Sequence, residues 1–491
     1  MIIQNANEKY DTRFNTMLCF SDWRFSAAAL GLIKYFKNYG IDYSTKLNDR
    51  EDLLLYNRED ILISENEDRY YSFVEKEFKD KIYNSKIFEY LDRESLSEDE
   101  KKELNSLLKQ NSILSKVFKG QKYSKENIDN LKRILSDNRI QIIRETYRNG
   151  KATYSNFCNK NSLEKESVGI CRVIGYYVDI GKKRKSLGFN WDYNKFVSED
   201  FPEFDYIPFA FTKTRESFFI NNNSSAENLY NANRILYNKI KNDVKDNKEN
   251  SNPRKALFLA ESLSSEFLDY QVEVILKDRE KDYFETIFVR DKAIDIFKEI
   301  SKMKDDNVIK AITNPCKYGN SSYLNMTNIV VDSILNNIKL DFILDKLLKD
   351  RNNHGYLISQ LIRINEILYL GVENMDKNIM FAKSTAEKVV NKFIEDNKQK
   401  KITSYRNKLI SSLSFKDYDR FKTILLQLSS YSGVTFDFAY NLFDDFEKNK
   451  NIAYAFVNAL TENKSNENNN RNDEGKKIDQ LSNVKKKINN N

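Results

Sequence analysis

The stretch Asp205–Phe211, DYIPFAF, together with Ser217–Leu229, SFFINNNSSAENL, is the most informative part of the chain. Its apolar, aromatic residues lead directly into three consecutive asparagines at positions 221–223. Ser224 and Glu227 then stand three residues apart, which is the spacing of a capping box at the start of a helix. The pattern predicts a strand-like run that ends in a polar loop, followed at once by a helix. Backbone N–H groups at such a helix start attract phosphate or carboxylate.

The asparagines Asn221, Asn222 and Asn223 allow two interpretations. In the first, they form a polar turn that caps the next helix. In the second, the loop enters a groove of DNA, because an asparagine amide carries both a donor and an acceptor and can hydrogen-bond to base edges. In the minor groove such contacts would mainly separate A·T from G·C pairs. The sequence leaves both interpretations open.

Length and composition describe a folded protein with a modest positive charge. The 491 residues suffice for about two to four domains. A hydrophobic share of 40% and an aromatic share of 13% can fill a sizeable core. Lysine and arginine number 80 against 73 aspartates and glutamates, which gives a net charge of +7. This excess favours an anionic partner, and where the cations gather matters more than their total.

The cysteines Cys19, Cys158, Cys171 and Cys316 are widely spaced, and none belongs to a C-x-x-C pair. A structural zinc site needs four soft ligands placed close together, so we predict no metal and no cofactor. The chain opens without a signal peptide, and no apolar run approaches the roughly 20 residues that span a membrane. These features predict a cytoplasmic protein that does not enter the membrane.

The N-terminal part of the chain, residues 1–325, predicts a mixed α+β domain. A buried helix is expected over Phe25–Tyr39, where Gly31 allows close packing and Gly40 ends the helix. Short strands are expected at residues 60–64 and 69–74.

Two further patterns lie within this domain. Residues 80–150 are highly charged and have helical spacing, which predicts an inserted helical subdomain. Residues 270–276 and 283–289 alternate on either side of the charged turn Asp278–Glu280, which is the signature of an antiparallel hairpin.

The C-terminal part, residues 326–461, predicts an all-α bundle. Short polar turns separate segments with helical spacing, as in an antiparallel bundle: 376–396, 402–413, 415–431 and 435–460. Residues 462–491 are rich in Asn, Lys and Glu and are predicted to be disordered. The predicted fold class is therefore α+β, with antiparallel strands and a helical insertion followed by a helical bundle.

Signatures of an enzyme are missing from the sequence. It contains no G-x-x-x-x-G-K-[ST] phosphate loop and no G-x-S-x-G elbow. The single histidine, His354, has no cysteine or serine of note beside it and is predicted to be a surface residue at a helix end. Carboxylates are so abundant that E-x-K triplets such as residues 77–79 arise by chance and do not identify a metal-dependent nuclease. We therefore predict that the protein is not an enzyme.

A glycine-bracketed run of cations is a candidate contact with nucleic acid. Residues 181–188 read GKKRKSLG and contain Lys182, Lys183, Arg184 and Lys185. A flexible cationic loop suits contact with phosphates and releases counterions as it binds. A solvated hairpin tip would have the same composition.

A second cationic cluster lies around the start of a predicted bundle helix. It comprises Lys398, Lys400, Lys401, Arg406 and Lys408. Such a cluster is also typical of an ordinary exposed helix face.

The residues Phe20–Leu32, FSDWRFSAAALGL, resemble the opening D-W-x-x-x-A-x-x-G-L/F helix of a CRISPR-associated family. Residues Ile207–Phe211 and Phe218–Asn223 resemble the second landmark of the same family. The family is the Cas-eight type large subunit of type I Cascade complexes, and subtype I-B is the most similar. The order and spacing of the landmarks, the chain length and the terminal helical bundle agree with it.

This resemblance implies a role in antiviral defence. The large subunit sits at the crRNA 5′ end, with backbone, small and crRNA-processing subunits as partners. It recognises the protospacer-adjacent motif (PAM) in target duplex DNA, promotes R-loop formation, steadies the displaced strand and helps recruit the helicase-nuclease. It is not usually a catalyst. Many relatives carry paired C-x-x-C motifs thought to hold zinc, whereas here Cys158 and Cys171 are each unpaired.

Together, the residues and the resemblance suggest a division of labour. Lys182–Lys185 would anchor phosphates, the loop at 221–223 would probe the adjacent motif, and the cations of the bundle would hold single-stranded DNA. Two alternatives stay open. One is a stand-alone defence or toxin-like metal-dependent nuclease, and the other is a scaffold that touches only protein subunits.

Overall fold

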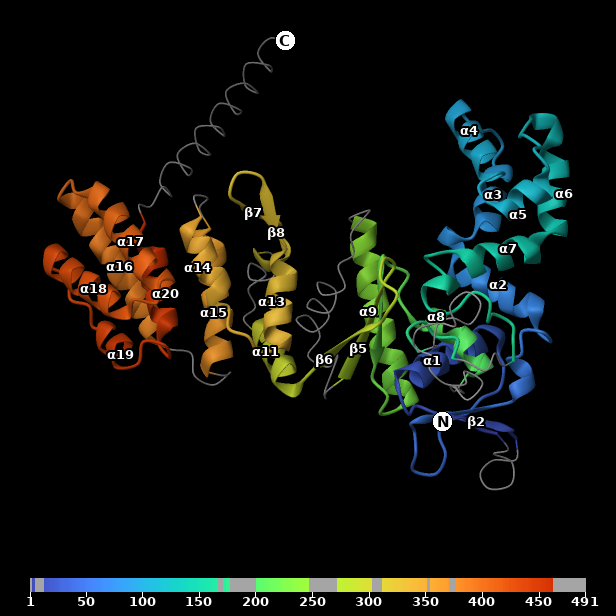
Figure 1. Ribbon diagram of the computed structural model, residues 1–491, viewed down its shortest axis with the longest axis horizontal. Coiled ribbons are helices and arrows are strands. Elements are labelled where there is room, and N and C mark those ends of the chain that lie inside the picture. The colour runs from blue at the N-terminus through green and yellow to red at the C-terminus, as the bar shows by residue number, and fades with distance from the viewer. Residues whose placement is uncertain are drawn as a thin grey trace, which may run out of the picture. The chain divides into compact units, whose positions relative to one another are not determined.

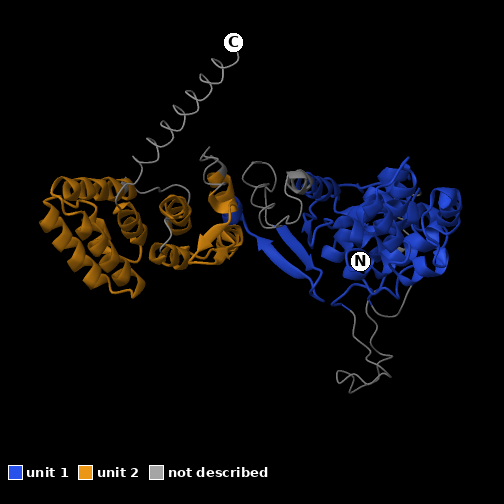
Figure 2. Ribbon diagram, turned by 90° about the horizontal axis from the view of Figure 1, so that it is seen from above, with its two compact units in different colours: residues 1–294 blue, residues 295–491 orange. Residues whose placement is uncertain are grey.

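A computed structural model describes residues 2–4, 13–166, 171–176, 200–246, 272–302, 311–350, 354–370 and 377–461. The chain divides into two compact units, residues 1–294 and 295–491 (Figure 2). The first unit combines helices with small antiparallel sheets, and the described part of the second is helical apart from one short hairpin (Figure 1). The predicted α+β class with a helical C-terminal region is confirmed. The predicted boundary near residue 325 lies within the second unit.

Helix α1, Trp23–Tyr39, supplies much of the large hydrophobic core of the first unit. It begins at Asp22, whose side chain accepts a hydrogen bond from the Arg24 N–H, and ends at Gly40, which has a left-handed φ of 63°. The residues Ala27–Ile33 are all buried, as expected for a helix that is apolar on most faces. The predicted helix and its end at Gly40 are confirmed.

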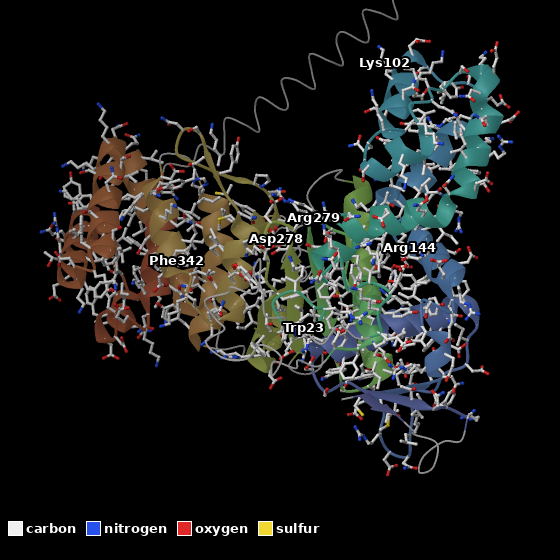
Figure 3. All side chains as sticks on the ribbon, turned by 45° about the vertical axis from the view of Figure 1, so that its right-hand side comes forward. Trp23, Lys102, Arg144, Asp278, Arg279 and Phe342 are labelled. Carbon is white, nitrogen blue, oxygen red and sulfur yellow. The ribbon has the colours of Figure 1, made fainter. Side chains whose placement is uncertain are left out.

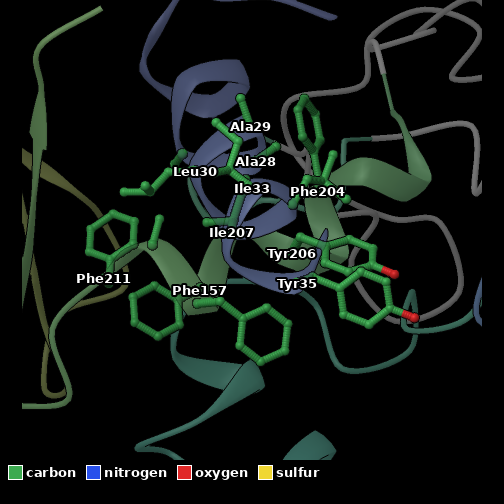
Figure 4. Packing of buried hydrophobic residues seen from close by; sticks show 14 of the residues in the cluster. Ala28, Ala29, Leu30, Ile33, Tyr35, Phe157, Phe204, Tyr206, Ile207 and Phe211 are labelled. Atoms are coloured by element: carbon green, nitrogen blue, oxygen red, sulfur yellow. The ribbon is translucent and has the colours of Figure 1, made fainter. Parts of the chain in front are cut away.

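Residues Pro202–Tyr206 form a 3₁₀ turn, and Ile207–Ala210 form the short helix α8; both pack against α1. Figure 4 shows Phe204, Tyr206 and Ile207 around the buried face of α1. The prediction of a strand-like run was wrong for residues 205–210, which belong to the 3₁₀ turn and α8. Pro208 lies in the first turn of α8, where a missing N–H costs nothing.

Two three-stranded antiparallel sheets belong to the first unit. One has the order β1 (Ile2–Gln4), β2 (Thr16–Cys19) and β3 (Leu53–Tyr56). The other has the order β4 (Glu216–Asn221), β5 (Val272–Asp278) and β6 (Glu285–Val289). Strands β5 and β6 form the predicted hairpin, with Val272 opposite Val289.

The strands expected at residues 60–64 and 69–74 are not formed. Residues Arg58–Asp60 make a 3₁₀ turn, and Glu67–Glu77 make helix α2. The buried side chains of α2 are Tyr70, Tyr71, Phe73 and Val74. Their aromatic character suggested a strand, but residues three and four apart share one face of a helix, and this face packs into the core.

The region predicted as a helical insertion has its own small core. It contains α3 (Tyr83–Leu91), α4 (Glu98–Leu107), α5 (Ser112–Phe118), α6 (Ile128–Asp137) and α7 (Arg139–Asn149). Leu104, Leu114 and Leu131 belong to a hydrophobic cluster separate from the one around α1.

A buried ion cluster ties the middle of the chain to the turn before α8. Arg172 is fully buried and forms a bidentate ion pair with Asp200. Its Nε donates to Oδ1 at 2.9 Å and its Nη2 donates to Oδ2 at 3.0 Å. Its Nη1 lies 2.7 Å from Oδ1 of Asp205, which also accepts the Tyr154 hydroxyl at 2.6 Å. Burial alone would lower the pKa of Arg172, but the carboxylates of Asp205 and Asp200 outweigh burial and raise it.

Helix α9, Ala226–Asp246, follows the asparagine loop. The predicted capping box is shifted by one residue, because the Asn228 N–H donates to Ser225 Oγ at 3.1 Å. Ser224 Oγ instead donates to Asn222 Oδ1 at 3.2 Å and accepts from Asn228 Nδ2 at 3.0 Å. Ser224 is therefore part of the loop that precedes the helix, and Ser225 caps the helix.

The second unit is built from helices and the hairpin β7 (Cys316–Tyr318) and β8 (Ser322–Leu324). Helix α11, Asp291–Lys302, begins just before the boundary between the units. The other helices are α13 (Met326–Leu335), α14 (Asp341–Lys349), α15 (Gly355–Leu370), α16 (Lys377–Glu395), α17 (Gln399–Ser414), α18 (Tyr418–Ser432), α19 (Ala439–Asp444) and α20 (Lys450–Ala459). Helices α16, α17 and α15 pack against α20, and α17 packs against α18.

The segment expected over residues 435–460 is two helices. Helix α19 ends at Asp445, which has an extended backbone, and the Asp445 side chain accepts a hydrogen bond from the Lys448 N–H. Such a local side-chain contact competes with helix continuation. The structure's described residues include no helix long and apolar enough to cross a membrane. The tail at 462–491 and the cations Lys182–Lys185 lie outside those residues.

Candidate nucleic-acid interface

The asparagine loop is held by hydrogen bonds within the chain. Asn221, the last residue of β4, donates from Nδ2 to Glu273 Oε2 of β5 at 3.0 Å, and its side chain is buried. Asn222 is also buried, and it accepts the Ser224 hydroxyl. These two side chains therefore shape the loop, as the interpretation of a polar turn requires.

Asn223 is the member of the loop that stays partly exposed. Its Nδ2 donates to the Phe20 carbonyl oxygen at 3.1 Å, which joins the loop to the residues just before α1. Within the described residues, no donor reaches its Oδ1. This contact brings together the two stretches Phe20–Leu32 and Ile207–Asn223, which are far apart in the sequence of the first unit.

An open pocket of about 620 Å³ lies where these stretches meet. Its wall includes Asp22, Trp23, Asn223, Glu273, Phe288 and Arg290. Phe288, on the outer strand β6, is 56% exposed. Arg290 is exposed directly after this strand.

Trp23 is a fixed wall of the pocket. The centroid of its ring lies 4.6 Å from that of Phe284. Its Nε1–H donates to the Tyr176 hydroxyl at 2.9 Å (Figure 3). The Nη2 of the neighbouring Arg24 lies 2.7 Å from Asp22 Oδ2. The guanidinium carbon of Arg24 lies 4.4 Å from the ring centroid of Tyr176, in a cation–π contact. The ring of Trp23 is thus positioned from several sides.

The pocket contains side chains of types that can contact base edges in DNA. An arginine can contact guanine, an asparagine oxygen can accept from an amino group, and an exposed phenylalanine can wedge between bases. In the minor groove the only amino donor is that of guanine. Of the residues that line this pocket, Asn223 was a candidate from the sequence, whereas Phe288 and Arg290 were not. The signal available in the sequence was an aromatic residue, Phe288, at an outward position of a strand, two residues before the cation Arg290.

The cluster at the start of α17 combines with an aromatic ring. The Nζ atoms of Lys398 and Lys401 lie 5.2 Å and 4.8 Å from the ring centroid of Tyr431, on α18. Tyr431 is 40% exposed, and Lys400 is exposed nearby in the sequence. Lys398 also pairs with Asp396 at 3.1 Å. We call Lys398, Lys401 and Tyr431 the bundle platform.

Arg406 has a different environment from the lysines of α17. Its Nε donates to the Val457 carbonyl oxygen of α20 at 3.2 Å, and burial lowers its pKa. Arg406 therefore helps to hold α17 against α20. Its place in the predicted cationic cluster came from sequence proximity alone.

His354 lies at a helix end, directly before α15, as predicted, but its side chain is only 10% exposed and is not the surface group that the sequence had suggested. Its Nε2 lies 2.6 Å from Asp350 Oδ2, and its Nδ1 lies 3.8 Å from Cys316 Sγ. This order of thiol, imidazole and carboxylate is that of a cysteine nucleophile with its base. However, burial and the nearby Asp350 raise the pKa of the Cys316 thiol, whereas an activated nucleophile requires a lowered pKa. Among the described residues, these three included, no three His, Cys, Asp or Glu side chains are placed to hold a metal ion.

A protein-family model with the description CRISPR-associated protein Csx8 matches residues 14–460 of the chain. The match covers both units and both stretches that form the pocket. Neither a curated protein nor a solved structure matches the chain.

Proposed function

The chain belongs to the family of CRISPR-associated protein Csx8, and on this premise we propose that it is a non-catalytic, DNA-binding large subunit of a type I-B-like Cascade complex. In this role it recognises the PAM, promotes R-loop formation and helps recruit the helicase-nuclease. Its partners are the crRNA-containing subunits, target duplex DNA and the displaced single strand.

The pocket at the asparagine loop is the observation that carries this proposal. It joins the two stretches that resemble the large-subunit family, and the Asn223–Phe20 hydrogen bond links them directly. Arg290 and the Asn223 oxygen supply a donor and an acceptor at the rim, and Phe288 supplies an exposed ring. These groups suit the reading of one or two base pairs, which is what a short motif requires. Longer sequence recognition would belong to guide pairing.

Strand separation needs a second surface that holds single-stranded DNA. The bundle platform offers an exposed ring flanked by two ammonium groups. Bases stack on such rings without regard to sequence, and the cations follow the backbone. This combination supports a role in holding the displaced strand.

We expect the double variant Asn223→Ala/Arg290→Ala to lose motif discrimination in the assembled complex. Each good base contact contributes about 1–3 kcal/mol of discrimination, so the preference for targets with the correct motif should fall by about 10-fold or more. Binding to targets with a scrambled motif should change little. The measurement is electrophoretic mobility shift with matched duplexes that differ only in the motif.

Arg50→Ala is the control for this experiment. Arg50 is an exposed cation of the same unit that pairs with Asp52 at 3.1 Å and does not line the pocket. An equal loss of affinity for all duplexes in the double variant would contradict base reading. Cleavage of labelled DNA by the pure protein with Mg²⁺ or Mn²⁺ would instead support the nuclease alternative.

We expect Tyr431→Ala to weaken binding of single-stranded DNA by about 5-fold or more, because stacking on one ring contributes about 1–3 kcal/mol. Tyr440→Ala is the matched control, since Tyr440 is 78% exposed in the same unit and lies outside the platform. Fluorescence anisotropy with a labelled oligonucleotide measures both. Equal affinities for the two variants would exclude the platform as a stacking site.

A further inference from the structure

Four cations of the first unit lie near one another without an ion-pair partner among the described residues. They come from three separate segments. Lys81 ends the 3₁₀ turn Lys79–Lys81 and Lys86 lies in α3, which follows it; Arg215 precedes β4, and Arg279 follows β5. Figure 3 labels Arg279 beside Asp278 at this turn. None of the four was singled out by the sequence, because the three segments are far apart in the chain.

The arginine of the hairpin turn is the best-defined member. Arg279 Nη2 donates to the Thr214 carbonyl oxygen at 3.3 Å, which places its guanidinium beside Arg215. Its Nε is buried and has no hydrogen-bond partner within the described part of the chain. Arg215 itself is exposed. The buried Nε is out of reach of a ligand, so the exposed guanidinium of Arg215, beside that of Arg279, is the part of this pair that suits a phosphate.

The electrostatics agree with the geometry. Burial, and then the charge of Arg279, lower the pKa of Lys81, and Lys86 acts in the same direction. Burial, and then the charge of Arg215, lower the pKa of Arg279. The carboxylates of Asp80, Asp278 and Glu280 offset part of this repulsion but form no ion pair with the four cations.

Two other lysines near this region are already engaged. Lys34 donates to the Phe209 carbonyl oxygen at 2.8 Å, and Lys213 donates to that of Pro208 at 2.9 Å. They cap the end of α8 from inside the fold, and we do not include them in the site.

We propose that Lys81, Lys86, Arg215 and Arg279 form a binding site for the phosphate backbone of nucleic acid. The inference rests on the proposed function and adds a contact surface distinct from the pocket and the bundle platform. A backbone site of this kind positions a strand without reading its sequence. The phosphates belong either to target DNA or to the guide RNA, which share this chemistry.

The test is the variant Lys81→Gln/Lys86→Gln/Arg215→Gln/Arg279→Gln in the full chain. Its affinity for duplex DNA and for guide RNA is measured over a salt series, each as a separate arm. For duplex DNA, each lost phosphate contact lowers the slope of log affinity against log salt by about 0.9, so the slope should fall by about 2–4. A smaller slope in the DNA arm identifies target DNA as the ligand. A smaller slope in the RNA arm identifies the guide RNA.

A control variant removes four cations that already have partners. It is Lys46→Gln/Arg50→Gln/Lys101→Gln/Lys102→Gln, whose cations pair with Glu51, Asp52, Glu98 and Asp99. The net charge changes by the same amount in both variants. The control should keep the parent slope in both arms. Equal slopes for the two quadruple variants would contradict the proposed phosphate site.

Thermal unfolding distinguishes a binding role of the four cations from a role in stabilising the fold. Since the four cations repel one another, their removal should leave the melting temperature unchanged or raise it, whereas a fall of many degrees would show that they hold the fold. The proposed function is tested independently by motif discrimination. If the parent discriminates motifs and the slopes do not change, only the backbone site fails. If the parent binds no nucleic acid, the proposed function fails.

Discussion

Replacing Gly31 with alanine is expected to destabilise the protein by more than about 3 kcal/mol, the upper range for overpacking. In an ordinary helix the same change would stabilise by about 1 kcal/mol. At Gly31 a Cβ would lie 2.1 Å from the Tyr206 carbonyl oxygen and 2.9 Å from the Tyr206 carbonyl carbon. Both are backbone atoms and cannot rotate away. The steric cost therefore exceeds the gain in helix propensity, and α1 and the turn before α8 would have to separate.

Urea unfolding of the full chain, followed by tryptophan fluorescence, measures this effect because Trp23 begins α1. Gly40→Ala is the control on the same helix. Gly40 has a φ of 63°, but a Cβ there would meet nothing within 4 Å. Its expected cost is about 1–2 kcal/mol from the left-handed backbone alone. If the Gly31→Ala variant were as stable as the Gly40→Ala variant, α1 could not pack as closely against the Tyr206 backbone as the structure shows.

Replacing Arg172 with alanine is expected to cost about 3–5 kcal/mol. The variant leaves the carboxylates of Asp200 and Asp205 buried without their counterion. It also removes the donor to the Lys165 carbonyl oxygen, 2.7 Å from Nη2. Burial already raises the pKa of Asp205, and loss of Arg172 removes the main charge that opposes this. Asp205 should then bind a proton at higher pH in the folded state.

Two comparisons test the origin of the effect. Arg50→Ala breaks an exposed ion pair and should cost less than about 1 kcal/mol. Arg172→Leu/Asp200→Asn/Asp205→Asn removes the charges together and should recover part of the stability lost in Arg172→Ala, because no uncompensated charge remains. Chemical denaturation of the three variants measures both. A triple variant less stable than Arg172→Ala would show that hydrogen bonds, and not charge, dominate this cluster.

Local patterns predicted the elements whose contacts are close in sequence. Helix α1 carries its own start at Asp22 and its own end at Gly40, and the β5–β6 hairpin is joined by a short turn. The predictions failed where one pattern suits two structures. The aromatic run of α2 reads equally as a strand, and the spacing over residues 435–460 continues across the break at Asp445.

The candidate interface was predicted only in part, for the same reason. The asparagine loop was visible as a run, but burial of Asn221 and Asn222, and exposure of Asn223, follow from the pairing of β4 with β5. The contact of His354 with Cys316 could not be read from the sequence, because the two residues are 38 positions apart. The four cations of the backbone site share no local pattern at all.

The sequence by itself determined that this chain is an α+β protein with a buried N-terminal helix, a hairpin and a helical C-terminal part. These properties depend on periodicity and on caps, which act over a few residues. Only the tertiary structure decided which polar side chains are available to a ligand. Availability depends on partners brought from distant segments, such as Phe20 beside Asn223 and Thr214 beside Arg279. Hydrogen bonds and desolvation act through space, so their effect on a side chain appears only once the chain is folded.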